Sequence, residues 1–206
     1  GRPRYDYEDL ADALKALPRV TTIDGAVTGT TLDDGLIDAL ANAKAVTSLD
    51  LSEGRCDWQS LRRLLSSFPR LQKLDLWSLN DLPGSHEFSV SEWTEVFGGA
   101  PGITHLELGG DLVVTNELIS AVCSSLKHLE ELKVSNVNNE RVTADCLQHL
   151  HKLSRIKILR FEDIEGPYLQ LQALINACKT LKYLQFTLLE AHPDHDEVLD
   201  CMLSDR

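Results

Sequence analysis

Apolar residues recur along most of the chain with one spacing: a first residue, a second three positions later, and a third two positions after that. The stretch 71–76, Leu-Gln-Lys-Leu-Asp-Leu, shows this triplet in full. Its seven copies begin at Val20, Val46, Leu71, Ile103, Leu129, Ile156 and Leu181, and by subtraction successive starts lie 26, 25, 32, 26, 27 and 25 residues apart. A period of this length predicts a repeat array in which each unit contributes one short strand and one helix.

Amphipathic segments lie between the triplets, as such an array requires. Residues 7–17 predict a first helix, which ends at Pro18 because proline cannot continue a helix. Further helices are expected at about 33–43 and 89–98. Other helices are expected around four apolar groups: Leu61, Leu64, Leu65 and Phe68; Leu118, Ile119 and Val122; Leu147, Leu150 and Leu153; and Leu171, Leu174, Ile175 and Cys178. A short last helix is expected to carry Val198, Leu199 and Met202.

The repeats predict one elongated domain over residues 1–206. Residues 1–30 are interpreted as an N-terminal cap or degenerate repeat, 31–187 as the repeats, and 188–206 as a C-terminal cap or a truncated repeat. The long interval of 32 residues contains the segment 79–86, whose Asp-Leu-Pro-Gly composition predicts a loop. Insertions of this kind often lie on a binding face, and a neutral surface excursion is the alternative.

The repeat resembles that of leucine-rich repeat proteins. Cys178-Lys179-Thr180-Leu181-Lys182-Tyr183-Leu184 is similar to the cysteine-containing type found in F-box substrate receptors, and the repeat length is also similar to the ribonuclease-inhibitor type. The resemblance implies an α/β solenoid of about seven strand–helix repeats of roughly 26 residues, with a parallel concave sheet and convex helices. It also implies a non-catalytic protein that binds another protein. Two finer roles are implied: substrate recognition in an F-box-type ubiquitin ligase, or regulation of a GTPase such as Ran.

Strand alternation predicts which side chains the concave sheet exposes. If Leu74 and Leu76 face the core, residues 73, 75 and 77 face outward, and the same holds for each copy. This gives three columns. The first contains Thr22, Ser48, Lys73, His105, Glu131, Ile158 and Tyr183; the second Asp24, Asp50, Asp75, Glu107, Lys133, Arg160 and Gln185; and the third Ala26, Ser52, Trp77, Gly109, Ser135, Glu162 and Thr187.

The second column changes sign along the array, from four carboxylates to two cations. The net charge of −12 and the absence of Lys and Arg between Leu74 and Leu126 favour a protein partner with a basic patch or segment. Trp77 is expected to be an interface anchor, because tryptophan is enriched among binding hot spots. A solvated charge row with no ligand, and a Trp77 ring that packs on its neighbours, are the alternatives. The predicted partner-binding set is Asp24, Asp50, Lys73, Asp75, Trp77, His105, Glu107, Lys133, Arg160 and Tyr183.

No catalytic residue, metal site or cofactor is predicted. The chain lacks a Gly-rich phosphate loop, a nucleophile elbow and a Cys–His pairing. The polar turn 192–196 has metal-ligand residue types, but a solvated turn or helix cap is the favoured interpretation. The acidic charge argues against nucleic acid as a partner, and no apolar run is long enough for a membrane span.

The five cysteines, at 56, 123, 146, 178 and 201, are odd in number and form no Cys-x-x-Cys pair. They are expected to be buried thiols rather than a disulfide framework. Together with the absence of Asn-x-Ser/Thr sequences, this favours an intracellular protein, cytoplasmic or nuclear, and a monomer is expected.

Overall fold

The recurring triplets form the strands of one sheet. The computed structural model describes residues 7–25, 29–81, 88–135, 147–162, 178–189 and 196–202. In sheet order the strands are β1 (Thr22–Ile23), β2 (Ser48–Asp50), β4 (Lys73–Asp75), β6 (His105–Gly109), β7 (Glu131–Ser135), β8 (Ile158–Glu162), β9 (Tyr183–Leu189) and β10 (Asp196–Met202). Strands β1 to β9 of this sheet pair in parallel, so the predicted parallel sheet is confirmed.

The strands pair at equivalent positions of the repeat. Thr22 pairs with Ser48, Ser48 with Lys73, and the same position continues through His105, Glu131, Ile158 and Tyr183. The triplet spacing therefore predicted the spatial register of the sheet. Backbone N–H groups of Thr47, Gln72 and Thr104 extend this ladder by donating to the preceding unit.

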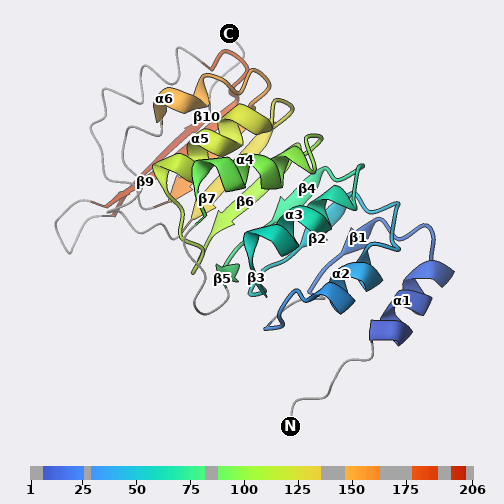
Figure 1. Cartoon of the computed structure of the whole chain (residues 1–206). Coiled ribbons are helices and arrows are strands. Elements are labelled where there is room, and N and C mark those ends of the chain that lie inside the picture. Colours follow the sequence, from blue (N-terminus) through green and yellow to red (C-terminus); the bar gives the residue numbers. More distant parts are fainter. Residues whose placement is uncertain are drawn as a thin grey trace.

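Helices cover one face of the sheet and leave the other open (Figure 1). They are α1 (Tyr7–Ala16), α2 (Asp34–Leu40), α3 (Trp58–Ser66), α4 (Val90–Gly98), α5 (Asn116–Ser125) and α6 (Leu147–Leu150). A second sheet pairs β3 (Arg55–Cys56) with β5 (Asn80–Asp81) in parallel. Four helices begin with a side chain that accepts a hydrogen bond from the backbone N–H three residues later, which satisfies an otherwise unpaired donor. These N-cap residues are Asp33, Asp57, Ser89 and Thr115.

The core lies between the sheet and the helices. Equivalent strand leucines stack from unit to unit and are at most 2% exposed: Leu49, Leu74, Leu106, Leu132 and Leu159. Phe68, Phe97 and Phe161 are fully buried among them. Trp93 is also buried and lies against Phe88 and Phe97, with ring centroids 4.7 and 5.6 Å apart. The prediction that these apolar positions face inward is confirmed.

Two predictions about the fold are wrong. Residues 196–202 form strand β10, antiparallel to β9, instead of the expected last helix. The free edge of β9 offers unpaired backbone groups, and pairing them outweighs the weak helical pattern of so short a segment. Gly109 and Ser135 of the third column are buried rather than exposed. These are the last residues of β6 and β7, and they pack closely: Gly109 has a φ of 144°, and any Cβ on it would collide with the carbonyl oxygen of Ser135.

Several predictions fall outside the described residues. These are the helix around Leu171 and Leu174, most of the loop 79–86, position 26 of the third column, and most of the polar turn 192–196. The other helices are confirmed with changes of boundary. The first ends at Ala16 rather than Leu17, and the second spans Asp34–Leu40 rather than 33–43. Helices α3 and α6 end before Phe68 and Leu153, which were expected to lie on them.

Candidate functional site

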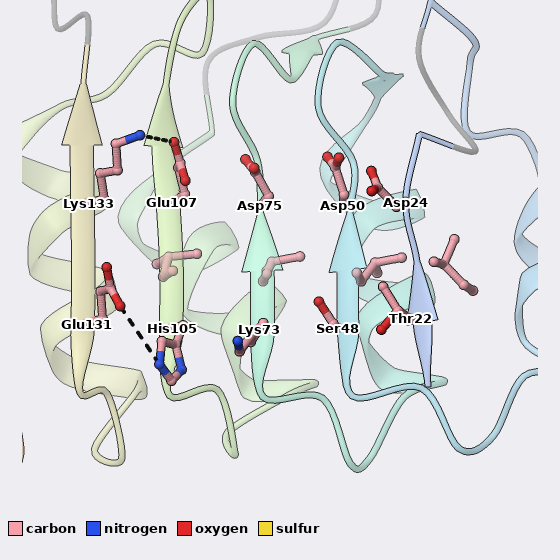
Figure 2. A pocket seen from close by; sticks show the side chains of 14 residues that line it. Thr22, Asp24, Ser48, Asp50, Lys73, Asp75, His105, Glu107, Glu131 and Lys133 are labelled. Atoms are coloured by element: carbon pink, nitrogen blue, oxygen red, sulfur yellow. Dashed lines mark hydrogen bonds and ion pairs between the residues drawn. The ribbon is translucent and has the colours of Figure 1, made fainter. Parts of the chain in front are cut away.

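The open face of the sheet carries a hollow of about 310 Å³ over β1, β2, β4, β6 and β7. Figure 2 shows two rows of polar side chains standing on these strands. The first and second predicted columns supply the polar lining: Thr22, Asp24, Ser48, Asp50, Lys73, Asp75, His105, Glu107, Glu131 and Lys133. Strand alternation therefore predicted that these side chains face one open surface.

Asp50 and Asp75 also have a structural role that the sequence analysis missed. The Oδ1 atom of Asp50 accepts the backbone N–H of Ser52 at 2.7 Å, and that of Asp75 accepts the N–H of Trp77 at 2.8 Å. In such a turn the Asp side chain accepts a hydrogen bond from the backbone N–H two residues later. This hydrogen bond takes the place of the strand-to-strand hydrogen bonds where the chain turns. Within these turns Glu53 and Ser78 have positive φ angles of 57° and 52°. The Leu-Asp-Leu sequence is the signal for this role, since Asp favours such turns.

The N-terminal end of the hollow is acidic. Asp24 and Asp50 lie side by side (Figure 2), and the hydrogen bond and charge repulsion between them raise the pKa of Asp24 above its usual value. Burial acts to raise the pKa of Asp50, but its hydrogen bonds with Ser52 and Asp24 outweigh burial and lower the pKa.

Asp75 lies between two other carboxylates of this row. Burial is the main cause of the raised Asp75 pKa, and repulsion from Glu107 and Asp50 adds to it. The hydrogen bond from the Trp77 N–H and the attraction of Lys133 oppose the increase. Its Asp50 and Glu107 neighbours lie in register on the strands at either side. Lys73, in the adjacent row, forms no ion pair with any residue in the described part of the chain. A cation placed over Asp75 would relieve this repulsion.

The middle of the hollow is electrically balanced. Lys133 Nζ lies 2.5 Å from Glu107 Oε1, so the change of sign in the second column produces an ion pair between β6 and β7. His105 Nε2 lies 3.8 Å from Glu131 Oε2, and its Nδ1 is 2.8 Å from the Thr104 hydroxyl. The predicted four-carboxylate ridge is therefore effectively three carboxylates long, because Lys133 neutralises Glu107.

The same face continues past the hollow onto β8 and β9. Arg160 pairs in register with Lys133 on one side and Gln185 on the other. Its guanidinium carbon lies 5.3 Å from the centre of the Tyr183 ring, a cation–π arrangement. The Nε atom of Arg160 is buried and has no hydrogen-bond acceptor among the described residues.

Three members of the predicted set do not line the hollow: Trp77, Arg160 and Tyr183. Trp77 lies in the turn after β4, half-buried, rather than on the strand. Its carbonyl accepts the backbone N–H of Glu53 at 3.0 Å. Its role as an anchor stays a prediction.

No group of three or more His, Cys, Asp or Glu in the described ranges is arranged to hold a metal ion. Of the helices that the structure describes, none is both long and apolar enough to cross a membrane. Cys56, Cys123 and Cys178 are buried, and burial raises the pKa of the Cys178 thiol to about 11.

No family model matches the sequence. No curated protein sequence matches it either. Solved structures share its fold: 82% of this chain matches 26% of the chain in a TLR13–ssRNA13 complex, with a TM-score of 0.50 and 16% identity. This chain thus spans about a quarter of that protein's length.

Two other structures match over longer shares of their own length. An internalin C2 from Listeria monocytogenes matches over 89% of this chain and 78% of its own, with a TM-score of 0.48 and 17% identity. The yeast Rad7–Elc1 complex matches over 87% and 54%, with a TM-score of 0.46 and 16% identity. With the in-register parallel sheet, the similarity to TLR13 shows a leucine-rich repeat solenoid, and it shows the fold alone.

Proposed function

We propose that this leucine-rich repeat solenoid is a non-catalytic protein-interaction module that binds a partner protein on its concave face. The observation that carries the proposal is the hollow over β1 to β7, where side chains from five strands of the large sheet converge on one open surface. The backbone groups below it are already used in the parallel ladder. Recognition there must depend on side chains, and this chain supplies carboxylates, hydroxyls, two lysines and a histidine.

The concave face carries charged side chains that form no ion pair in the described part of the chain. On the convex face Arg63 pairs with Asp34 and Asp38 of α2, both at 2.5 Å, and Arg62 pairs with Glu95 of α4 at 2.6 Å. These charges link successive helices. On the concave face Asp75 and Lys73 have no such partner in the described part of the chain. Charges without an internal ion pair are available to a second molecule.

The acidic N-terminal end of the hollow supports a partner with a basic patch or segment. Complementary charge raises the association rate and loses effect as salt screens it. The finer roles implied by the repeat type, a receptor of an F-box-type ubiquitin ligase or a regulator of a GTPase, stay predictions. An intracellular location is part of the proposal, supported by the burial of Cys56, Cys123 and Cys178.

A steric block tests the proposed face. Ser48 lies half-buried on β2 between Thr22 and Lys73, so Ser48→Trp would fill the hollow. Gln59 is exposed on α3 of the convex face, and Gln59→Trp adds the same side chain there. Proteins captured from a cell lysate by the wild-type chain should also be captured by Gln59→Trp and lost with Ser48→Trp. Loss with Gln59→Trp alone would place the binding surface on the helices.

A further inference from the structure

The two ends of the concave face carry opposite charge. The inference drawn from this difference rests on the proposed function and specifies the partner. Asp24, Asp50 and Asp75 form the acidic end over β1, β2 and β4. Arg160 on β8 is the cation at the other end, since Lys133 is already paired with Glu107. Between the two ends, the charged residues of the second column cancel.

We propose that the partner contributes one extended segment that lies across the strands of the concave face. It places a Lys or Arg side chain over Asp50 and Asp75 and an Asp or Glu side chain on Arg160. The two partner residues are about four to six positions apart in sequence. The charge order of this chain thus fixes which end of the segment faces the N-terminal repeats.

The spacing follows from the sheet geometry. Asp75 is three strands from Arg160 and Asp50 is four strands away, all at one register position. At about 4.8 Å between strands, these separations are about 14 Å and 19 Å, and an extended segment covers about 3.3 Å per residue. Four to six residues therefore span the two ends.

The segment must cross the strands rather than join them. Strands β2, β4, β6, β7 and β8 each have a neighbour on both sides, so none offers an unpaired edge. Pairing with a partner strand is therefore excluded on this surface, and side-chain contacts set the specificity. Charge complementarity is then the main determinant of specificity on this surface.

At each end of the concave face, one charged side chain lacks an interaction that the proposed partner residue would supply. At the acidic end, burial and repulsion raise the pKa of Asp75, and a partner ammonium or guanidinium opposes both effects. At the other end, the Arg160 Nε–H is buried without an acceptor in the described ranges, an arrangement that costs free energy. The Tyr183 ring lies against the guanidinium. A partner carboxylate that binds the Arg160 guanidinium through two hydrogen bonds would draw this side chain outward and accept one of the two bonds from Nε–H.

A displayed library of random peptides of about 12 residues tests the inference, because this length exceeds the span of about 19 Å. Four forms of the whole chain serve as baits: wild type, Arg160→Gln, the double variant Asp50→Asn and Asp75→Asn, and Ser48→Trp. Asparagine retains the oxygen that accepts the Ser52 and Trp77 N–H groups, so the double variant removes charge while keeping both turns. Circular dichroism confirms that each bait is folded before selection.

Wild type should enrich peptides with a basic and an acidic residue four to six positions apart. Arg160→Gln should abolish the preference for the acidic residue only, and the double Asn variant the preference for the basic residue only. For one enriched peptide, Arg160→Gln and a Glu→Gln change in the peptide should each weaken binding about three- to fivefold, as expected of one exposed ion pair. Made together, the two changes should weaken binding no further, because they remove the same contact.

The inference is overturned if wild type enriches no peptide, or if its peptides lack this spacing, or if both charge variants enrich the same peptides as wild type. Ser48→Trp separates the two claims. If it abolishes enrichment while the charge variants change nothing, the concave face is the site and only the two-ended charge recognition is wrong. If Ser48→Trp enriches the same peptides as wild type, both claims fail.

Discussion

Replacing Asp75 by asparagine should stabilise the protein at neutral pH. The carboxylate is half-buried and stands in register between Asp50 and Glu107. Asparagine retains an oxygen for the Trp77 N–H at 2.8 Å and removes the charge. Like charges directly opposite on neighbouring strands cost about 0.2–1 kcal/mol, and we expect a gain in this range. A gain of about 0.5 kcal/mol raises the urea midpoint by roughly 0.2–0.5 M.

The equivalent substitution Asp50→Asn should have the opposite sign. Hydrogen bonds from Ser52 lower the pKa of Asp50, so its charged form stabilises the fold at neutral pH. Exchanging a charged acceptor for a neutral one should cost about 0.5–1.5 kcal/mol. Part of this cost is offset because Asp24 is released from the interaction that raises its own pKa.

The pH dependence follows from the direction of each shift. Asp75 has a raised pKa in the folded state, so its protonated form favours folding, and its destabilising effect appears only as pH rises through the folded pKa. Asp50 has a lowered pKa, so its stabilising effect exists above the ordinary value of 3.8 and is lost as pH falls through the folded pKa. As pH falls, the difference between wild type and variant should shrink earlier for Asp75→Asn than for Asp50→Asn.

Equilibrium urea unfolding followed by circular dichroism, at pH about 7 and about 4.5, measures both effects. Asp75→Ala is the control for the turn, because alanine removes the Trp77 acceptor together with the charge, and it should be less stable than Asp75→Asn. If Asp75→Asn instead lowers the midpoint at neutral pH as much as Asp50→Asn does, the electrostatic reasoning about this row is refuted.

Three further predictions concern the fold. Leu74→Ala should cost about 2–5 kcal/mol because the leucine is 2% exposed in the core, whereas Lys73→Ala on the same strand should change the urea midpoint little; equal midpoints for both would show that the strand phase is wrong. Gly109→Ala should cost at least about 1–3 kcal/mol from its φ of 144° alone, whereas Gly98→Ala, with open space around it, should be neutral or stabilising; thermal melts compare the two. The Cys178 thiol, with a pKa of about 11, should react with a thiol reagent only after denaturant is added; rapid labelling of Cys178 in the native protein would contradict its burial.

The register of the sheet could be predicted from the sequence because the spacing of the apolar triplet is the same in each repeat. A strand leucine that is not in phase with its neighbours would leave the core, so the positions of Leu49, Leu74 and Leu106 fix how β2, β4 and β6 align. Two of the three predicted surface columns follow directly from this alignment. The third does not, because strand alternation ends at Gly109 and Ser135.

The remaining features depend on contacts that a spacing does not encode. The Asp side chains at 50 and 75 were predicted as ligands for a partner, and the structure also uses them to turn the backbone. The ion pair between Glu107 and Lys133 could not be predicted, because it depends on the rotamers that the two side chains adopt on neighbouring strands. Strand β10 forms because β9 offers an edge, which is a tertiary effect that the residues 196–202 do not show by themselves.

Photo-crosslinking from the concave face is the most direct test of the proposed function. A benzoylphenylalanine placed at Ser48 lies on β2 within the hollow, and the same group placed at Gln59 lies on the exposed side of α3. Illumination with a captured partner should give a crosslink from position 48 and none from position 59. The yield from position 48 should fall as salt is raised, because screening weakens a charge-dependent complex. A crosslink from position 59 with none from position 48 would contradict the proposal that the concave face binds the partner.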